Sequence, residues 1–544
     1  MSRTPPAAGS LARCRTLPAL GVAVLLGVAL TSGIGASSAV AQNVLRVANS
    51  GEPDSLDPHQ VSGNWEDRIV GDMFMGLTTE AADGTVIPGA AESWTISDDG
   101  LTYTFTLRDH TWSDGTPVTA DDFVFGFRRI LDPATAAEYA YLLYPIKNAE
   151  AINNGSQTDP EALGARAVDP KTLEITLEQP TSYFIELLTH YTSFPIPKHK
   201  VDELGDDWVK PGNIVGNGAY TVVEWVPNSQ VRMAKNENFW DAENVAIDEV
   251  IYYPTEERNT GTKQFRAGEV DVQYDFASEQ IDFLKENLPE ATHLSPELAA
   301  YYYVFNTKRP PFDDVRVRKA LAMAVERDAI TEKILRTGEI PAYNLVPPKA
   351  GTYGEPPQVD WADVPYQERV EQAKALLAEA GFGPENPLKF TLRYNTSENH
   401  KKIAIAIAAM WKQIGVDAEL FNTEVKVHYN DLQSHDFQVA RAGWVADYND
   451  PENFLSLLRT STGPMNYGQY ENPEFDRLMA ESDATTDSKA RNELMRQAET
   501  LMLADMPVIP IYHYVSKNLV SPRVQGWVDN TKNKHWTRWL SLAE

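Results

Sequence analysis

Cysteine is almost absent from the sequence, because Cys14 stands alone among 544 residues. It precedes an apolar run near the N-terminus, whereas an exported lipid-anchored protein carries its cysteine directly after such a run. A single thiol forms no intrachain disulfide and leaves no set of cysteines for a metal site. We therefore expect no lipid anchor and no disulfide in the processed chain, whose stability must come from packing and hydrogen bonding.

Basic residues are also scarce, with 48 Lys and Arg against 77 Asp and Glu and a formal net charge of −29. No extended basic run offsets this imbalance. Because binding to a phosphate backbone needs clustered Lys and Arg, nucleic acid is not an expected partner. After the first forty residues, no stretch reaches the roughly 20 apolar residues that a membrane-spanning helix needs, so direct membrane insertion is not expected either.

Known catalytic motifs are missing as well, among them G-x-S-x-G, H-E-x-x-H and G-x-x-x-x-G-K-[ST]. The segment 447–451 fails as a calcium loop because Pro451 takes a ligand position and the required glycine is missing. Gly216-Asn-Gly218 lacks the third glycine of a dinucleotide loop and is predicted to be a turn. We expect no enzyme, metal or cofactor. The open alternative is a hydrolase whose catalytic groups meet only in the folded chain.

The first forty residues have the pattern of a secretory signal peptide. Arg3, Arg13 and Arg15 form a charged front, an apolar run follows over residues 17–30, and Ala39-Val-Ala41 offers small residues for cleavage. We predict that residues 1–41 are the signal peptide, with cleavage near Ala41. The processed protein is then expected to be exported, soluble and periplasmic.

The length of the chain exceeds the size at which one hydrophobic core stops growing, so we expect two or more lobes. Strand patterns dominate the first part, and helical spacing becomes frequent after about residue 300. One helix is expected to begin at a Thr119 cap, with acidic residues in its first turn. Other predicted elements are strands at 44–48, 102–108, 173–177, 220–225, 388–394, 438–442 and 508–514, and helices at 315–335, 370–380 and 400–414. Such interleaving is typical of an α/β lobe.

Charged and aromatic residues are concentrated between Arg441 and Asp450. The arginine and Asp447 lie six residues apart, which is too far for a helical i,i+4 ion pair, and Gly443 and Asn449 favour a strand that runs into a loop. Each charge is therefore expected to have a different partner. This composition suits a ligand site, and the alternative is that both are ordinary surface charges. Asp450 is interpreted as a turn residue.

Several motifs resemble those of the periplasmic oligopeptide-binding proteins of ABC transporters, within extracellular solute-binding family 5, which handles peptides and nickel. The similarity extends over essentially the whole processed chain. The motifs that carry it are Ser55-Leu-Asp-Pro-His59, Trp112-Ser-Asp-Gly-Thr-Pro-Val-Thr119, Asn213-Ile-Val-Gly-Asn-Gly-Ala-Tyr220, Asp314-Val-Arg-Val-Arg318, Ala378-Glu-Ala-Gly-Phe382, Tyr394-Asn-Thr-Ser397 and Arg441-Ala-Gly-Trp444. The segments 394–400 and 441–448 are the most specific to the oligopeptide branch.

The resemblance implies an α/β fold of three domains, namely a bilobal periplasmic binding protein (type II-like) with mixed sheets and a hinge between the lobes. Domain I would comprise residues 42–74, 201–298 and 515–544, domain II residues 75–200, and domain III residues 299–514. Relatives also carry a disulfide whose two cysteine positions match Ala299 and Val445 here, so packing would replace that bridge.

The resemblance also implies roles for site residues. Asp447 would pair with the α-ammonium of a bound peptide, and Arg441 or His400 would meet the free carboxylate, according to peptide length. Backbone groups near Tyr141 and Gly443 would pair with the peptide in strand fashion. Trp444, Tyr274 and Tyr514 would line side-chain pockets, with plain core packing as the alternative. The ligand-binding set is completed by Val445, Asn395, Asp275, Ser62 and Asn64.

The expected function is that of a monomeric, non-enzymatic receptor that delivers short peptides to an inner-membrane ABC permease. A receptor for cell-wall (murein) peptides, or for another solute, is a second hypothesis within the same class. A peptide hydrolase or chaperone is the hypothesis from a different class.

Overall fold

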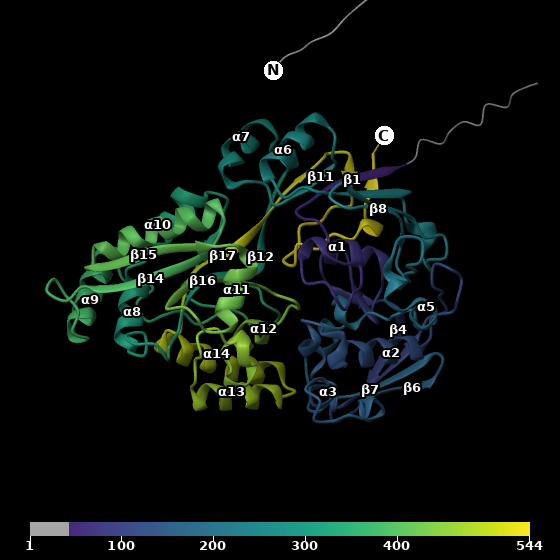
Figure 1. Cartoon of the computed structure of the whole chain (residues 1–544), viewed down its shortest axis with the longest axis horizontal. Coiled ribbons are helices and arrows are strands. Elements are labelled where there is room, and N and C mark those ends of the chain that lie inside the picture. The colour runs from purple at the N-terminus through teal and green to yellow at the C-terminus, as the bar shows by residue number, and fades with distance from the viewer. Residues whose placement is uncertain (1–42, 544) are drawn as a thin grey trace, which may run out of the picture. The chain divides into compact units, whose positions relative to one another are not determined.

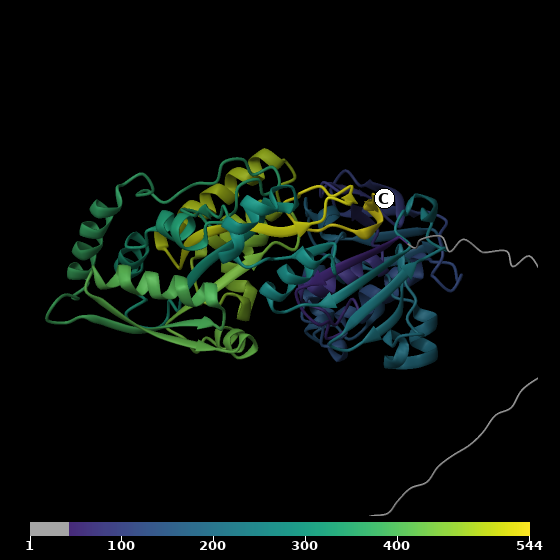
Figure 2. The same ribbon diagram turned by 90° about the horizontal axis from the view of Figure 1, so that it is seen from above.

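The computed structural model describes residues 43–543, and the predicted signal peptide lies outside the described residues. Helices and strands alternate along this part of the chain and form several sheets, which confirms the α/β class (Figures 1 and 2). Among residues 43–543, no helix is both long and apolar enough to cross a bilayer.

Within the described residues, eleven strands form the largest sheet, in the order β15-β14-β16-β12-β17-β11-β1-β10-β9-β8, with β13 paired to β17. β1 pairs in parallel with β10 and β11, and β14 pairs in parallel with β15 and β16, whereas the other pairs are antiparallel. The strands are β1 (Val44–Asn49), β8 (Tyr220–Val226), β9 (Gln230–Lys235), β10 (Glu249–Pro254), β11 (Val272–Tyr274), β12 (Thr292–Phe305), β13 (Ile340–Pro341), β14 (Leu388–Asn395), β15 (Val416–Thr423), β16 (Val439–Val445) and β17 (Val508–Val520). The sheet is therefore mixed, as expected.

The two longest strands, β12 and β17, connect the two halves of this sheet (Figure 1). One end of the pair lies beside β11 and the other beside β16. Their register shifts between Pro296 and Ala300, so the ladder is interrupted between the halves. A large apolar cluster drawn from residues 298–512 surrounds one half, and another, mostly from residues 45–274, surrounds the other. Two separate cores confirm the expected two-lobed organisation.

A separate four-stranded sheet, in the order β4-β5-β7-β6, confirms the early strand predictions. Helix α2 (Ala120–Leu131) accompanies it and begins after Thr119, whose hydroxyl and backbone N–H both bond to the Asp122 carboxylate at 3.1 and 2.8 Å. This arrangement satisfies a free backbone N–H at the helix start, as the sequence predicts. The strands are β4 (Ala91–Ile96), β5 (Thr102–Leu107), β6 (Ala165–Asp169) and β7 (Thr172–Thr176), and two-stranded sheets are formed by β2 (Thr78–Glu80) with β3 (Val86–Pro88) and by β18 (Val524–Gln525) with β19 (Ser541–Leu542).

Besides α2, thirteen α-helices of the described chain pack around the large sheet and the four-stranded sheet. They are α1 (Asn64–Met73), α3 (Ala149–Asn153), α4 (Phe184–Leu187), α5 (Lys198–Leu204), α6 (Arg258–Ala267), α7 (Ile281–Asn287), α8 (Val315–Met323), α9 (Tyr366–Glu379), α10 (Glu398–Lys412), α11 (Val425–Gln433), α12 (Glu452–Leu455), α13 (Pro473–Asp483) and α14 (Ser488–Asp505). The predicted helices at 370–380 and 400–414 are thereby confirmed within a few residues. α9 is followed by Gly381 with φ of 89°, the left-handed conformation that favours glycine.

The predicted continuous helix at 315–335 is wrong. α8 ends at Met323, and a separate π-helical segment spans Ala329–Leu335. Between them, the buried Arg327 donates from Nε to the carbonyls of Ala342 and Pro510 at 2.6 and 2.9 Å. A continuous α-helix would not place this guanidinium at those carbonyls, so tertiary hydrogen bonds override local helical spacing.

The predicted division into three domains stays a prediction. The second apolar cluster contains residues from the expected domain I and from the expected domain II, so these two parts share one continuous core. A shared core does not reveal where one domain ends and the next begins.

Ala299 and Val445, the positions that the resemblance matches to two bridged cysteines, lie directly opposite each other in the β12–β16 ladder. Ala446 N donates to the Leu298 carbonyl at 2.8 Å, so the neighbouring pair 299/445 is of the non-hydrogen-bonded type, in which side chains approach closely. We expect an Ala299→Cys, Val445→Cys variant to form an intramolecular disulfide on oxidation. Thiol titration of the unfolded protein should find none free before reduction. An Ala300→Cys, Val445→Cys control, whose side chains point to opposite faces, should keep both thiols.

Candidate functional site

Arg441 is buried in β16, with 7% of its surface exposed, and its partners are uncharged. Its Nη2 donates to the Tyr514 hydroxyl at 2.7 Å, and its Nη1 donates to Asn395 Oδ1 and to the Tyr429 hydroxyl, both at 3.2 Å. The guanidinium also lies 4.8 Å from the ring centre of Tyr301. No carboxylate within residues 43–543 forms an ion pair with it. A buried cation without a counter-charge is costly, so this arrangement favours an anionic ligand.

Gly443 allows the guanidinium to lie against the strand. A Cβ atom at this position would come within 2.8 Å of Arg441 Nη2 and 3.2 Å of the Tyr514 hydroxyl. The arginine side chain therefore runs along β16 towards the loop that follows the strand. Its charge is at the level of the glycine, two residues further along β16 than its own Cα.

One edge of β16 is unpaired where these residues lie. β14 pairs with this strand only at Val439 and Ala440, and no other strand of the described chain occupies the same edge further on. Since residue 446 bonds to β12 through its backbone N–H, the alternation of an antiparallel ladder directs the N–H and C=O groups of Gly443 and Val445 to the free edge. Four backbone groups are thus available to an extended ligand.

Asp447 lies just beyond this edge and has no ion-pair partner among the described residues. Its polar contacts are with Asn453 in α12, whose Nδ2 donates to its Oδ2 at 3.5 Å and whose Oδ1 accepts from its backbone N–H at 3.2 Å. The same Oδ1 accepts from Trp444 Nε1 at 2.8 Å, which ties the indole to the carboxylate. Burial raises the pKa of Asp447 to about 7, while Asn453 and the positive charge of Lys534 act in the opposite direction.

Aromatic side chains and a paired lysine surround this carboxylate. Tyr139 and Tyr141 stack with ring centres 5.7 Å apart, and burial together with the negative charge of Asp447 raises the pKa of both phenols well above the ordinary value. Lys534 is already engaged, because its Nζ lies 2.9 Å from Asp67 Oδ2. A buried carboxylate without its own cation, lined by rings, favours a cationic ligand group.

His400 lies in the first turn of α10, as the sequence predicts, although the hydroxyl of the Ser397 cap makes no capping bond. Its ring centre is 5.5 Å from that of Tyr301, the same ring that contacts Arg441. Its buried Nδ1 has no hydrogen-bond partner among the described residues. Burial, and then the charge of Arg441, lower the pKa of His400 far below its ordinary value, so the ring is neutral at pH 7.

The remaining expected site residues are placed less uniformly. Tyr274 is buried beneath the Arg68 guanidinium, 3.6 Å from its ring centre. Asp275 forms ion pairs with Arg258 and with Lys517, so its charge is already matched within the protein. Ser62 and Asn64 are exposed at the start of α1. No described contact joins Ser62 or Asn64 to Arg441 or Asp447.

Asp450 is more than a turn residue, which corrects the expectation from the sequence. Its two carboxylate oxygens accept from Arg491 at 2.8 Å each, and the same guanidinium lies 5.4 Å from the ring centre of Tyr183. Tyr183 in turn stacks on Tyr448 with ring centres 4.9 Å apart. These contacts hold the loop that carries Asp447.

Three contributors to the site were not identified from the sequence, namely Asn453, Tyr301 and Lys534. The run of three tyrosines at 301–303 is a usable indication, because consecutive phenols are unusual in a core strand. Nothing in the local sequence distinguishes Asn453 from an ordinary helix-start residue, or Lys534 from a surface lysine.

Comparisons with known proteins identify relatives of this chain. Residues 85–466 match the model for bacterial extracellular solute-binding proteins, family 5 Middle. The chain is 40% identical to the periplasmic murein peptide-binding protein MppA of Escherichia coli K12 (91% of this chain, 92% of that one) and 41% identical to the periplasmic oligopeptide-binding protein OppA of the same organism (96% and 98%). A crystal structure of Haemophilus influenzae OppA in complex with RPPGFSPFR superposes with a TM-score of 0.83, at 38% identity over 93% of this chain and 99% of that one.

Proposed function

Because this chain belongs to the bacterial extracellular solute-binding proteins of family 5, we propose that it is a periplasmic, monomeric receptor that binds short peptides between its lobes and delivers them to an ABC permease. The observation that carries the proposal is the pair of unmatched charges, Arg441 and Asp447, at the two ends of an unpaired strand edge. A zwitterionic peptide presents the complementary ammonium, carboxylate and backbone groups in the same order.

The separation of the two charges favours short ligands. The guanidinium lies beside Gly443, and the carboxylate belongs to residue 447, two residues beyond the end of β16. At about 3.3 Å per residue of extended chain, the two positions are at most about 13 Å apart. An extended peptide of roughly three to five residues spans such a distance between its termini. Asp447 then anchors the ammonium, Arg441 the carboxylate, and the backbone of Gly443 and Val445 pairs with the ligand without reading its sequence.

For Tyr141 we propose a different role from the one that the family resemblance implies. It lies in a 3-10 turn (Ala140–Leu143), and its carbonyl accepts from Tyr144 N at 3.1 Å, so its backbone is not presented as a strand. We propose instead that its ring, stacked on Tyr139, packs against the first residue of the ligand beside Asp447. His400 and Asn395 lie near the carboxylate end of the proposed ligand. The ring of His400 contacts that of Tyr301, and Asn395 accepts a hydrogen bond from Arg441.

Isothermal titration with trialanine, N-acetyl-trialanine and trialanine amide tests this assignment. Each blocked peptide is expected to bind at least about 30-fold more weakly, because one buried protein charge then lacks its partner. Equal affinity for the acetylated form would show that Asp447 does not bind the ammonium. Equal affinity for the amide would show that Arg441 does not bind the carboxylate.

The affinity for free-amine peptides should depend on pH in a definite direction. The pKa of Asp447 is raised to about 7 in the unliganded protein, and the ammonium binds the ionised carboxylate. Below that pH, binding must expel a proton, so affinity should fall by about tenfold per pH unit between pH 6.5 and 5. Titrations at pH 6 in two buffers of different ionisation enthalpy should report proton release. Absence of proton release at pH 6 contradicts the raised pKa.

A cell-wall (murein) peptide is the second candidate ligand, because a relative of 40% identity carries that name. Native mass spectrometry of the protein as purified distinguishes the two, since a murein peptide contains a diamino acid and differs in mass from products of protein breakdown. No catalytic role is proposed. Peptide cleavage that co-purified with the protein through a second, different column would contradict this view.

A further inference from the structure

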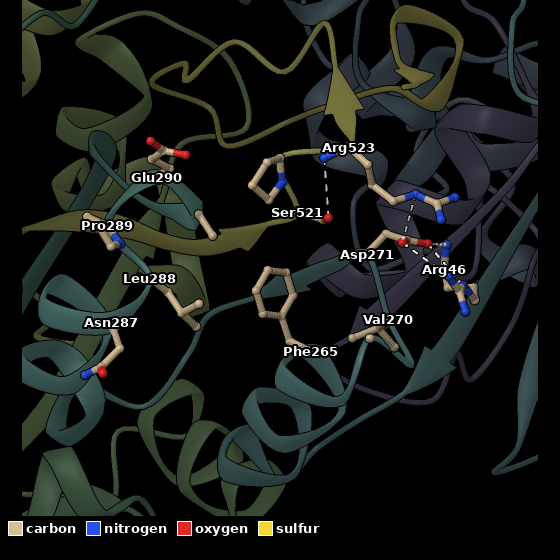
Figure 3. A pocket seen from close by; sticks show the side chains of 13 residues that line it. Arg46, Phe265, Val270, Asp271, Asn287, Leu288, Pro289, Glu290, Ser521 and Arg523 are labelled. Atoms are coloured by element: carbon tan, nitrogen blue, oxygen red, sulfur yellow. Dashed lines mark hydrogen bonds and ion pairs between the residues drawn. The ribbon is translucent and has the colours of Figure 1, made fainter. Parts of the chain in front are cut away.

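A cavity of about 400 Å³ lies on the lobe that contains β1 and β11 (Figure 3). Four segments line it, namely the start of β1, the end of α6 with the turn that follows, residues 287–291 at the end of α7, and the turn 521–523 after β17. None of the lining residues belongs to the candidate peptide site. Its volume lies within the range of small-molecule sites, roughly 300–1,000 Å³.

One side of this cavity is apolar. Phe265 and Val270 are 9% and 2% exposed, and they belong to a small apolar core that also contains residues of α7 and β17. Leu288 packs against the same core, and Figure 3 shows the ring of Phe265 between Leu288 on one side and a cluster of charged side chains on the other. The pocket therefore has an apolar wall and a separate polar end.

The polar end contains two cations for one anion. Asp271 is buried and accepts from Arg46 through the backbone N–H at 2.9 Å and through Nε at 3.1 Å, while Arg523 Nε lies 3.4 Å from its other oxygen. Figure 3 shows Glu290, another acid at the cavity, with its carboxylate directed away from this cluster. In a chain with a net charge of −29, one excess guanidinium at this polar end is a local exception.

Arg523 is the cation with the weaker contacts, since its ion pair with Asp271 is longer than that of Arg46. Its Nε makes no hydrogen bond to any described residue, and its Nη2 donates only over 3.4 Å to the Val44 carbonyl. The side chain is 41% exposed, and its Nη1 has no hydrogen-bond partner among the described residues. A guanidinium with free donors in a fixed fork matches a carboxylate in bidentate fashion.

We infer that this cavity is a second ligand site for an apolar monocarboxylate, with the carboxylate on Arg523 and the apolar body against Phe265 and Leu288. The same geometry disfavours amino acids and peptides. Their ammonium group would need an unpaired acid at the polar end, where the Asp271 carboxylate is already held by two arginines and the Glu290 carboxylate is directed away. The ligand class of this cavity is thus distinct from that of the site at Asp447.

Binding of 4-phenylbutyrate, followed by saturation-transfer NMR and by titration calorimetry, tests the inference. Its carboxylate and phenyl ring fit the two ends of the cavity. We expect saturable binding that is at least about tenfold tighter than that of 4-phenylbutyramide or of phenylalanine, because only the acid pairs with Arg523 without carrying an ammonium. Equal binding of the amide, or no binding of the acid, would overturn the inference.

Three variants localise the probe. Arg523→Met should weaken 4-phenylbutyrate by at least about tenfold, whereas Arg266→Met, which removes an arginine of α6 that does not line the cavity, should leave it unchanged. Asp447→Asn should also leave the binding of 4-phenylbutyrate unchanged, and saturating trialanine should not displace this probe. Loss of binding in Asp447→Asn, or displacement by trialanine, would place the probe in the peptide site and refute a second site, without bearing on the peptide proposal itself.

Discussion

Asp447→Asn is expected to weaken the binding of free-amine peptides by about 100-fold, which corresponds to about 3 kcal/mol. The amide keeps the size of the side chain and can keep its contact with Asn453, but it carries no charge for the ligand ammonium. A buried ammonium without a counter-charge loses its hydration and gains little in return. Titration calorimetry with trialanine at pH 7.5, where the wild-type carboxylate is largely ionised, measures the difference.

Two controls separate this effect from a general loss of structure. N-acetyl-trialanine should bind the variant and the wild type about equally, because it brings no ammonium. Asp436→Asn makes the same chemical change at an exposed carboxylate that pairs with Arg309 at 2.9 Å, and it should alter neither affinity. The affinity of Asp447→Asn for trialanine should also no longer decline between pH 6.5 and 5. Retention of full trialanine affinity by Asp447→Asn would refute the ammonium assignment.

Arg441→Met is expected to weaken the binding of trialanine by about 100-fold while leaving the binding of trialanine amide nearly unchanged. The guanidinium has phenol and amide partners but no carboxylate, so its full charge is available to the ligand. Methionine keeps much of the aliphatic stem beside Tyr301 and removes only the charge and the donors. Calorimetry with the two peptides on the two proteins forms a cycle that isolates the carboxylate–guanidinium interaction.

The same substitution should raise the thermal stability of the unliganded protein, because it removes a buried, unmatched cation. Arg393→Met in the neighbouring strand β14 is the matched comparison. Arg393 pairs with Asp431, so its loss leaves a carboxylate behind and should lower the melting temperature without changing peptide affinity. A lower melting temperature for Arg441→Met would show that its bonds to Tyr514 and Asn395 stabilise the fold more than the charge destabilises it.

Local chemistry explains why many elements could be predicted. The Thr119 cap, the stop at Gly381 and the alternating strand at 102–107 depend on residues within a few positions of one another. The stretch from Arg441 to Asp447 was also recognisable, since a strand that leads into a loop while carrying two unrelated charges is poorly suited to a core. The prediction that these charges have different partners is confirmed by their separate contacts.

The sequence by itself therefore determined the α/β class, most of the strands and helices, and the segment that carries the two candidate anchors. Only the tertiary structure decided which residues stand beside those anchors. Tyr301, Asn453 and Lys534 reach the site from three separate segments. It also decided that α8 ends early, since Arg327 bonds to carbonyls far along the chain. The physical reason is that local spacing records which face of an element is buried, whereas a missing counter-charge becomes visible only when all neighbours of a group are known.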